Sequence, residues 1–271
     1  MPRAERTSDE TAAAPAGAPR RSDRRPGSRR KAPPATVVLL VRHGTTTTTG
    51  VELPGRAPGL HLSDAGRRQA ERVAERIAAL AGLRAAPDES AAPADGNDDG
   101  RRGRGRGKDA PVPTVTAVYA SPLERTRETA APIARLLGHD VAVDDGLVEL
   151  DVGDWTGIEL KAARKRKEWT TIQRYPSGFT FPGGESFVAM QARITDTLAR
   201  LRATHPGQTI VAVSHADTIK AAVAHALGTH LDLFQRIVIS PCSVTAISYG
   251  DGGPTVLSVN SVGEGPAPAA S

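Results

Sequence analysis

The sequence contains one aliphatic run that ends in a basic pair and a glycine, Thr36-Val37-Val38-Leu39-Leu40-Val41-Arg42-His43-Gly44. A run of β-branched and aliphatic residues of this length is typical of a strand that is buried on both faces. In an open α/β sheet, chemistry lies just beyond the carboxyl ends of such strands. We therefore expect Arg42 and His43 to place a fixed cation beside a nucleophilic or basic imidazole. Gly44 is expected to allow a sharp turn and a close approach to a ligand.

Two further apolar runs are followed by polar residues in the same way. Val115–Ala120 precedes Ser121-Pro122, with Arg125 one helical turn later, and Thr209–Val213 precedes Ser214-His215. A serine followed by proline is typical of a helix cap and first helical position, so a helix is expected to begin there. Because right-handed crossovers bring the ends of parallel strands to one edge of a sheet, we expect two guanidiniums and two imidazoles to converge.

Such a cluster predicts an anionic ligand. Phosphate fits best, because it accepts bidentate contacts from arginine and carries nearly two negative charges. At an effective dielectric constant near 20, each contact between opposite charges at 4 Å is worth roughly 4 kcal/mol before desolvation is subtracted. The expected partner of this cluster is therefore a small phosphorylated molecule.

The pattern along the rest of the chain alternates helices and strands, which indicates an α/β fold. Ser63 is expected to cap a helix that runs to about Ala81, with a stripe of apolar residues on one side. Further amphipathic helices are expected at 185–204 and 218–227, and further strands at 141–143, 243–249 and 255–260. The last two strands are expected to form an antiparallel hairpin.

Three segments lack the pattern of a buried core. Residues 1–35 have nine basic and four acidic residues and no large apolar residue after Met1, so they carry the net charge of +5 and predict a disordered basic tail. A solvated tail is the favoured interpretation, and weak contact with nucleic acid is the alternative. Residues 84–112 are expected to be a disordered insertion and 263–271 a flexible tail. The predicted domain is 36–262.

Other features of the sequence exclude several classes of protein. Cys242 is the single cysteine, which rules out an internal disulfide framework and a cysteine-based zinc cluster. The remaining histidines show no metal-ligand spacing, so neither a metal nor a cofactor is expected. No apolar run approaches the ~20 residues that span a bilayer. The basic start is not followed by an apolar signal segment, and a cytoplasmic location is therefore expected.

Four motifs in order resemble those of the histidine phosphatase superfamily, also called phosphoglycerate mutase-like. They are Leu40-Val41-Arg42-His43-Gly44, Ser121-Pro122-Leu123-Glu124-Arg125-Thr126, the segment Leu147–Gly157 with Glu149, and Val213-Ser214-His215-Ala216. The resemblance covers residues 36 to about 262. It implies a three-layer α/β sandwich with a mostly parallel central sheet.

The resemblance also implies a role for each residue of the cluster. His43 would attack phosphorus and form a phosphohistidine, with its second ring nitrogen held by a backbone acceptor. Arg42, Arg125 and His215 would bind the phosphoryl oxygens. Glu149 would protonate the leaving oxygen and then deprotonate the incoming water.

Some positions depart from the family pattern. Thr49 stands where many members have asparagine, so its expected contact with the substrate is through a hydroxyl, and Arg56 is a second expected substrate-binding residue. Thr156 stands where glutamate is common, and Ala216 where glycine is common. The basic run 161–167 is expected to be a solvated helix face, with a lid for an anionic substrate as the alternative.

These features predict a metal-independent phosphomonoester hydrolase that acts on a small phosphorylated metabolite through a phosphohistidine. A cofactor-dependent phosphomutase is the alternative, and a non-catalytic module that binds a phosphorylated ligand is the second alternative. The segment after Gly157 is short and lacks a mutase-like pattern, which favours hydrolysis. Substrate specificity is expected to lie in the loops at 45–62 and 158–184.

Overall fold

The computed structural model describes residues 34–82 and 114–263. The segments that were expected to be disordered, 1–35, 84–112 and 263–271, lie outside the described residues except for Pro34, Ala35 and Gly263. Among the helices of the described part, none is long and apolar enough to cross a bilayer.

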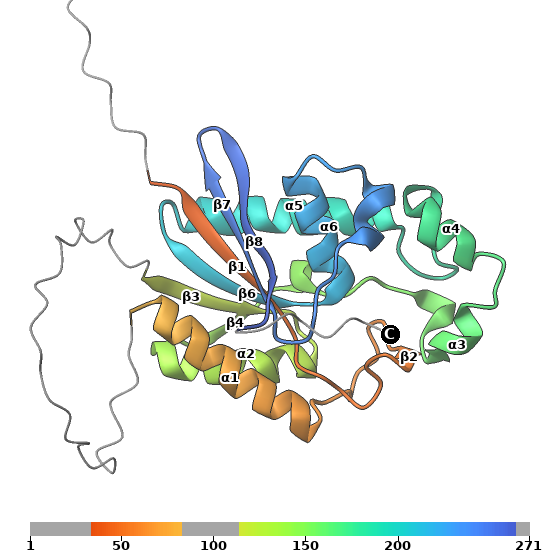
Figure 1. Cartoon of the computed structure of the whole chain (residues 1–271), viewed down its shortest axis with the longest axis horizontal. Coiled ribbons are helices and arrows are strands. Elements are labelled where there is room, and N and C mark those ends of the chain that lie inside the picture. Colours follow the sequence, from red (N-terminus) through yellow and green to blue (C-terminus); the bar gives the residue numbers. More distant parts are fainter. Residues whose placement is uncertain (1–33, 83–113, 264–271) are drawn as a thin grey trace, which may run out of the picture. The chain divides into compact units, whose positions relative to one another are not determined.

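A six-stranded sheet forms the centre of the fold (Figure 1). Its strands follow the order β4-β3-β6-β1-β7-β8. The first four of these strands are mutually parallel, whereas β7 and β8 are antiparallel to their neighbours. The bounds of the strands are Thr36–Arg42 for β1, Val115–Ala120 for β3, Val141–Val143 for β4, Thr209–Ser214 for β6, Val244–Gly250 for β7 and Gly253–Ser261 for β8. The predicted α/β fold with a mostly parallel sheet is confirmed.

Helices cover both faces of this sheet and complete three layers (Figure 1). They are α1 (Asp64–Leu80) and α2 (Glu124–Leu137) on one face, and α5 (Phe187–Thr204) and α6 (Ala216–Ala226) on the other. Leu39 and Val41 of β1 belong to the core with α1 and α2. Val38 and Leu40 belong to the core with α5 and α6. Because side chains on both faces of β1 are buried, the sequence of this strand is a continuous apolar run.

The starts of the first two helices differ in how well the sequence predicted them. Ser63 caps α1 as expected, and its Oγ accepts the N–H of Gly66 at 3.1 Å. The prediction that Ser121-Pro122 caps α2 was wrong, because the helix begins at Glu124 and its capping residue, Leu123, offers no side-chain acceptor. The Ser121 hydroxyl instead forms hydrogen bonds with His215 and Thr126 at the candidate site.

Short elements lie over the carboxyl end of the sheet. The bounds are Glu52–Leu53 for β2, Ile158–Glu159 for β5, Leu160–Ala163 for α3, Trp169–Arg174 for α4, and Asp145–Leu147, Gly153–Trp155, Pro176–Gly178 and Leu231–Arg236 for the 3-10 helices η1 to η4. β2 pairs with β5 in a second sheet of two strands. The basic run 161–167 is not a continuous helix face. Its Arg166 guanidinium lies 4.6 Å from the centroid of the Trp155 ring.

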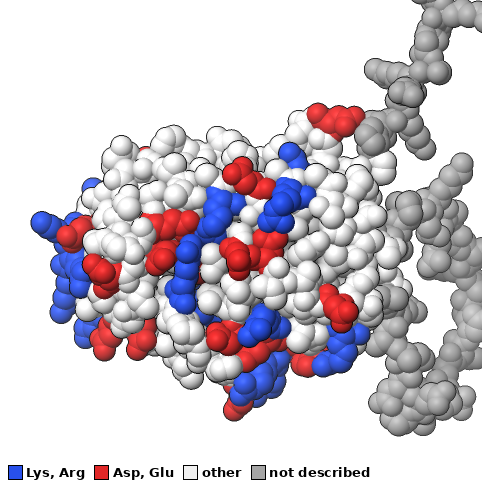
Figure 2. Space-filling view, turned by 180° about the vertical axis from the view of Figure 1, so that it is seen from behind, with Lys and Arg blue, Asp and Glu red and all other residues white. Residues whose placement is uncertain are grey.

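The charged side chains on the face shown in Figure 2 are of both signs. Lysine and arginine side chains are interleaved with aspartate and glutamate, and neither sign covers a broad area of this face. The alternative that the basic tail contacts nucleic acid concerns residues outside the described part of the chain.

Candidate active site

The ends of three parallel strands meet at one edge of the sheet. The backbone N–H of His43, just after β1, donates to the carbonyl of Ser214 at 3.0 Å. The N–H of Ser121, just after β3, donates to the carbonyl of Val213 at 3.1 Å. These two bonds extend the pairing of β6 with both neighbours, so the side chains that follow each strand lie beside one another.

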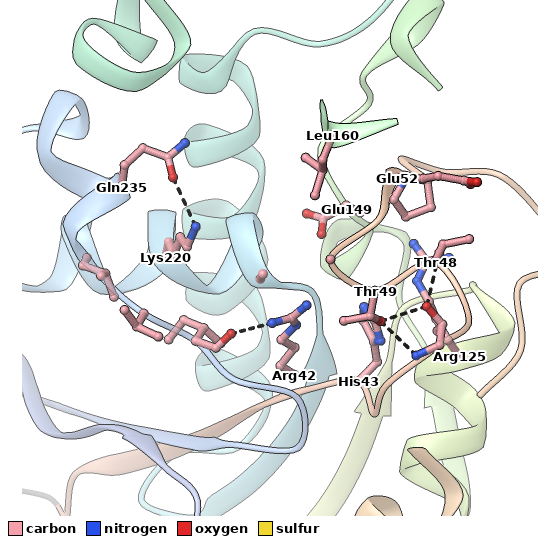
Figure 3. Close-up of a pocket in the computed structure, with 17 residues that line it drawn as sticks. Arg42, His43, Thr48, Thr49, Glu52, Arg125, Glu149, Leu160, Lys220 and Gln235 are labelled. Carbon is pink, nitrogen blue, oxygen red and sulfur yellow. Dashed lines mark hydrogen bonds between the residues drawn. The ribbon is translucent and has the colours of Figure 1, made fainter. Parts of the chain in front are cut away.

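A cavity of about 410 Å³ opens at this edge (Figure 3). Five of the seven predicted site residues line it, namely Arg42, His43, Thr49, Arg125 and Glu149. The other two, His215 and Arg56, are not among the lining residues. The structure therefore brings together the ends of β1, the first turn of α2 and the segment that contains Glu149.

His43 is buried and fixed in one orientation. Its Nδ1–H donates to the carbonyl of Gly44 at 2.7 Å, because a carbonyl can only accept, and this leaves Nε2 with a lone pair. Burial, and next the charges of Arg42 and Arg125, lower the pKa of His43 from 6.5 to about 3. The imidazole is therefore neutral at neutral pH, as a nucleophile requires.

Gly44 allows the first turn of α1 to pack directly against the site. A Cβ at Gly44 would lie 2.6 Å from the carbonyl oxygen of Gly66, closer than a side chain tolerates. A Cβ at Gly66 would in turn lie 2.1 Å from the carbonyl oxygen of Thr45. The close approach made possible by Gly44 is thus to the backbone of α1, which holds the turn after His43.

His215 lies next to His43 and is fully buried. The ring centroids are 5.2 Å apart and the ring planes are tilted by 60°. His215 Nε2 lies 2.7 Å from the Ser121 hydroxyl, which lies 2.8 Å from the Thr126 hydroxyl, and that hydroxyl donates to the carbonyl of Leu123 at 2.6 Å. Burial, followed by the charge of Arg125, lowers the pKa of His215 well below 6.5. Because the pKa values of both imidazoles are lowered, the positive charges next to them are those of the Arg42 and Arg125 guanidiniums.

Both guanidiniums have buried N–H groups that remain unpaired. Arg125 is fully buried and donates from one Nη to the carbonyl of Gly55 at 2.8 Å, and Arg42 donates to the carbonyl of Ile239 at 2.7 Å. Within the described residues, Arg42 Nε, Arg125 Nε and the other Nη of Arg125 have no hydrogen-bond partner. Unpaired buried donors cost free energy unless an acceptor meets them. Donors of fixed charge beside the cavity suit a phosphoryl group.

Glu149 supplies the carboxyl group of the cavity. One of its oxygens accepts the N–H of Leu150 at 3.0 Å and the Thr218 hydroxyl at 3.3 Å. Burial, and next the charge of Asp217, raise its pKa, while Leu150 N–H and the two guanidiniums partly oppose this shift. A carboxyl group with a raised pKa can hold a proton for a leaving oxygen.

Three charged side chains fix the backbone at Glu149. Arg56 Nε donates to the carbonyl of Glu149 at 2.8 Å, and Arg193 Nη2 donates to the same carbonyl at 3.4 Å. Glu185 Oε2 accepts from both arginines at 2.9 Å. Arg193 also donates to the carbonyls of Gly146 and Val148. We call Arg56, Arg193 and Glu185 the Glu149 clamp. Arg56 thus contacts the Glu149 backbone and is not among the residues that line the cavity.

Thr49 belongs to a threonine loop that folds on itself. Its hydroxyl accepts the N–H of Thr46 at 2.9 Å and lies 2.9 Å from the Thr46 hydroxyl, which also lies 3.3 Å from that of Thr48. All three threonines line the cavity. The contact of Thr49 with a substrate stays a prediction.

The comparison with known families agrees with the motifs. Residues 38–86 and 103–262 match the profile of the histidine phosphatase superfamily (branch 1). The chain belongs to this superfamily. Within the described residues, no group of three or more His, Cys, Asp or Glu side chains is arranged to hold a metal ion.

Relatives in this superfamily include both uncharacterised and named proteins. A bifunctional protein of Mycobacterium tuberculosis is 36% identical over 151 residues, which cover 55% of this chain and 42% of that protein. Phosphoserine phosphatase 1 of Hydrogenobacter thermophilus is 28% identical over 148 residues, which cover 54% of this chain and 70% of that protein. The chain thus spans about two fifths of the mycobacterial relative.

Solved structures share the fold. A phosphoserine phosphatase variant from Entamoeba histolytica in complex with phosphoserine has a TM-score of 0.66 at 22% identity, covering 84% of this chain and 98% of that one. A mycobacterial glucosyl-3-phosphoglycerate phosphatase has a TM-score of 0.65 at 23% identity, covering 84% and 99%. At these identities the likeness concerns the fold alone.

Several residues that build this site could not be recognised from the sequence. Ser121 carried a signal, its place directly after a strand, but the serine-proline pair suggested a helix cap. Lys220 also had a sequence signal, because it lies four residues after Ala216 on α6 and so shares a helix face with it. Both residues line the cavity. Glu185 and Arg193 carried none, since their partners are loop carbonyls and each other.

Proposed function

We propose that this chain is a metal-independent phosphomonoester hydrolase that forms a phosphohistidine at His43 and acts on a small phosphorylated metabolite. The observation that carries the proposal is the neutral His43 ring beside the unpaired N–H groups of Arg42 and Arg125. Nucleophile and oxyanion donors are thereby held within one cavity before substrate binds.

In the first step, His43 Nε2 attacks phosphorus as the ester P–O bond breaks. Arg42 and Arg125 bind the phosphoryl oxygens, with His215 Nδ1 beside them. Removing one such donor typically costs about 3–4 kcal/mol in the transition state. Glu149 gives its proton to the leaving oxygen, so the alcohol departs neutral. The products of this step are the alcohol, the phosphohistidine and the Glu149 carboxylate.

In the second step, water attacks the phosphohistidine. The Glu149 carboxylate takes a proton from the water as a new P–O bond forms and the P–N bond to His43 breaks. Inorganic phosphate leaves, and both His43 and Glu149 return to their starting forms. Proton transfer by a positioned group such as Glu149 typically contributes roughly 10²- to 10⁴-fold to the rate.

The relatives carry names of both kinds, since one from Salmonella choleraesuis, 28% identical over 138 residues, is a probable phosphoglycerate mutase, and the preference for hydrolysis therefore rests on the segment after Gly157. One relative is a phosphoserine phosphatase, and a protein of the same fold is a glucosyl-3-phosphoglycerate phosphatase. Another protein of this fold was crystallised with phosphoserine, a small phosphorylated ligand. A substrate of this size is in keeping with the cavity volume of about 410 Å³.

Turnover of p-nitrophenyl phosphate tests the proposal. We expect the activity to persist in EDTA, and His43→Ala to abolish both turnover and acid-labile labelling by a ³²P-phosphoester. His225→Ala replaces an exposed histidine on α6 and serves as the control, with turnover close to that of the parent. Loss of activity in EDTA, or labelling that survives His43→Ala, contradicts the mechanism.

The same preparation distinguishes the two alternatives. A phosphomutase would move the label to a second hydroxyl of the substrate when a bisphosphorylated primer is present, with little release of inorganic phosphate. A binding module would turn over no phosphoester but would still bind phosphate. Release of one inorganic phosphate for each ester consumed is the outcome expected here.

A further inference from the structure

The cavity extends beyond the phosphoryl-binding end to a wall that the mechanism does not use. Lys220 on α6 and Gln235 on η4 form this wall, and Figure 3 places them across the cavity from Glu52 and Leu160. The apolar side chains that line the cavity are chiefly Pro54, Leu160, Ile237, Val238 and Ile239.

Lys220 is held in one position. Its Nζ donates to Asp217 Oδ1 at 3.1 Å and to Gln235 Oε1 at 3.2 Å, and it lies 5.6 Å from the centroid of the Phe234 ring. The Lys220 side chain is only 17% exposed. An ammonium group has three N–H donors. Two are used by these contacts, so one remains for a ligand.

Lys220 also fixes the orientation of the Gln235 amide. Because an ammonium cannot accept a hydrogen bond, the amide atom that faces it is the oxygen. The amide NH₂ of Gln235 therefore keeps its two donors, and no described residue accepts from them. This wall consequently offers N–H donors only, from two adjacent side chains.

We propose that Lys220 and Gln235 form a subsite for a carboxylate on the alcohol part of the phosphomonoester substrate. A carboxylate accepts hydrogen bonds from both side chains at once, and its single charge complements the ammonium. A second phosphate fits less well, because Asp217 offsets part of the charge of Lys220 and Glu52 and Glu149 line the same cavity. This inference rests on the proposed function of the site.

A matched pair of ligands tests the subsite. 3-Phosphoglycerate and glycerol 3-phosphate differ only in a carboxylate against a hydroxymethyl group. Calorimetric binding is measured on the His43→Ala chain, which allows no turnover, and kcat/KM is measured on the parent. We expect both measurements to favour 3-phosphoglycerate by about tenfold or more. Equal affinity, or a preference for glycerol 3-phosphate, overturns the proposal.

Substitutions assign the preference to the two side chains. On the His43→Ala chain, Lys220→Met and Gln235→Glu should each reduce the ratio of the two binding constants at least fivefold. On the chain that retains His43, the same substitutions should change KM rather than kcat. Lys220→Arg should keep most of the preference. Lys165→Met, on the exposed basic run, is the control and should leave the ratio as in the parent. A ratio that survives Lys220→Met overturns the proposal.

The two proposals can fail separately. If p-nitrophenyl phosphate is not hydrolysed but 3-phosphoglycerate still binds with the Lys220-dependent preference, the proposed hydrolase function fails and the subsite stands. If p-nitrophenyl phosphate is hydrolysed and no carboxylate preference is found, the subsite fails and the hydrolase stands. Thermal unfolding of each variant identifies any that loses the preference by losing its fold.

Discussion

Ser121 and His215, which are 94 residues apart in the chain, are joined by a contact of 2.7 Å between Oγ and Nε2. Thr126 donates to the carbonyl of Leu123, so Ser121 donates to Thr126 and accepts the Nε2–H of His215. This leaves Nδ1 of His215 without a partner among the described residues. Under the proposed function, a bound phosphate would raise the affinity of Nδ1 for a proton, and the Ser121 hydroxyl would accept a hydrogen bond from the resulting imidazolium.

Removing this hydroxyl should weaken phosphate binding. We expect Ser121→Ala to raise the inhibition constant of inorganic phosphate about tenfold, since a hydrogen bond to a charged group is worth about 1.5–3 kcal/mol. Ser63→Ala is the matched control, because it removes the cap of α1 and costs about 1 kcal/mol of stability away from the cavity. If Ser63→Ala weakens phosphate as much as Ser121→Ala does, the effect is one of stability.

The pH dependence of turnover should reflect Glu149 on its alkaline side. Glu149 must be protonated to give its proton to the leaving oxygen, so kcat/KM should fall as pH rises through its raised pKa. On the acid side the His43 nucleophile stays neutral down to its pKa of about 3. Stopped assays of a phosphorylated alkyl alcohol across this pH range measure both limbs.

The choice of leaving group separates proton donation from other roles of Glu149. Glu149→Gln should slow hydrolysis of an alkyl phosphate by roughly 10²- to 10⁴-fold. Hydrolysis of p-nitrophenyl phosphate should fall much less, because p-nitrophenolate leaves without a proton. Equal losses on both esters would count against Glu149 as the proton donor.

The buried imidazole of His43 should make stability depend on pH. Its folded pKa of about 3 lies below the unfolded value of 6.5, so between these values the unfolded chain binds the proton and the folded chain does not. The free energy of unfolding therefore falls as pH drops through this window, by about 3 kcal/mol at pH 4 from this group. Urea titrations at pH 7 and pH 4 measure the loss of unfolding free energy, which should be about 3 kcal/mol smaller for His43→Asn than for the parent. His225→Asn should keep the loss of the parent.

Disruption of the Glu149 clamp should slow catalysis, although none of its three residues lines the cavity. Glu185 joins Arg56 and Arg193, and its loss frees both arginines from the geometry that holds the carbonyl of Glu149. We expect Glu185→Gln to lower kcat about tenfold, to leave KM within threefold and to shift the alkaline limb of the pH profile. Glu71→Gln makes the same change in an exposed pair with Arg135 and should leave all three quantities unchanged.

The parts of this fold that the sequence predicted are those governed by local pattern. The two-sided apolar run of β1, the Ser63 cap and the strand-end positions of Arg42, His43 and His215 follow from periodicity and from the rule for parallel sheets. Four motifs in family order also identified the superfamily.

The parts that it missed depend on distant contacts. A serine after a strand has the same local signature whether it caps a helix or binds a histidine 94 residues away. The side chain of Arg56 is directed by the carbonyl of Glu149, and the two-residue strands β2 and β5 exist only because they pair with each other. Neither interaction produces a periodic pattern of residues in the sequence.

The described chain stops at Gly82, two residues after the end of α1, and resumes at Thr114, directly before β3 (Figure 1). This junction lies at the amino ends of the parallel strands, whereas His43 follows the carboxyl end of β1. The junction therefore lies at the edge of the sheet opposite the candidate active site. It is a natural place to splice in a fluorescent reporter.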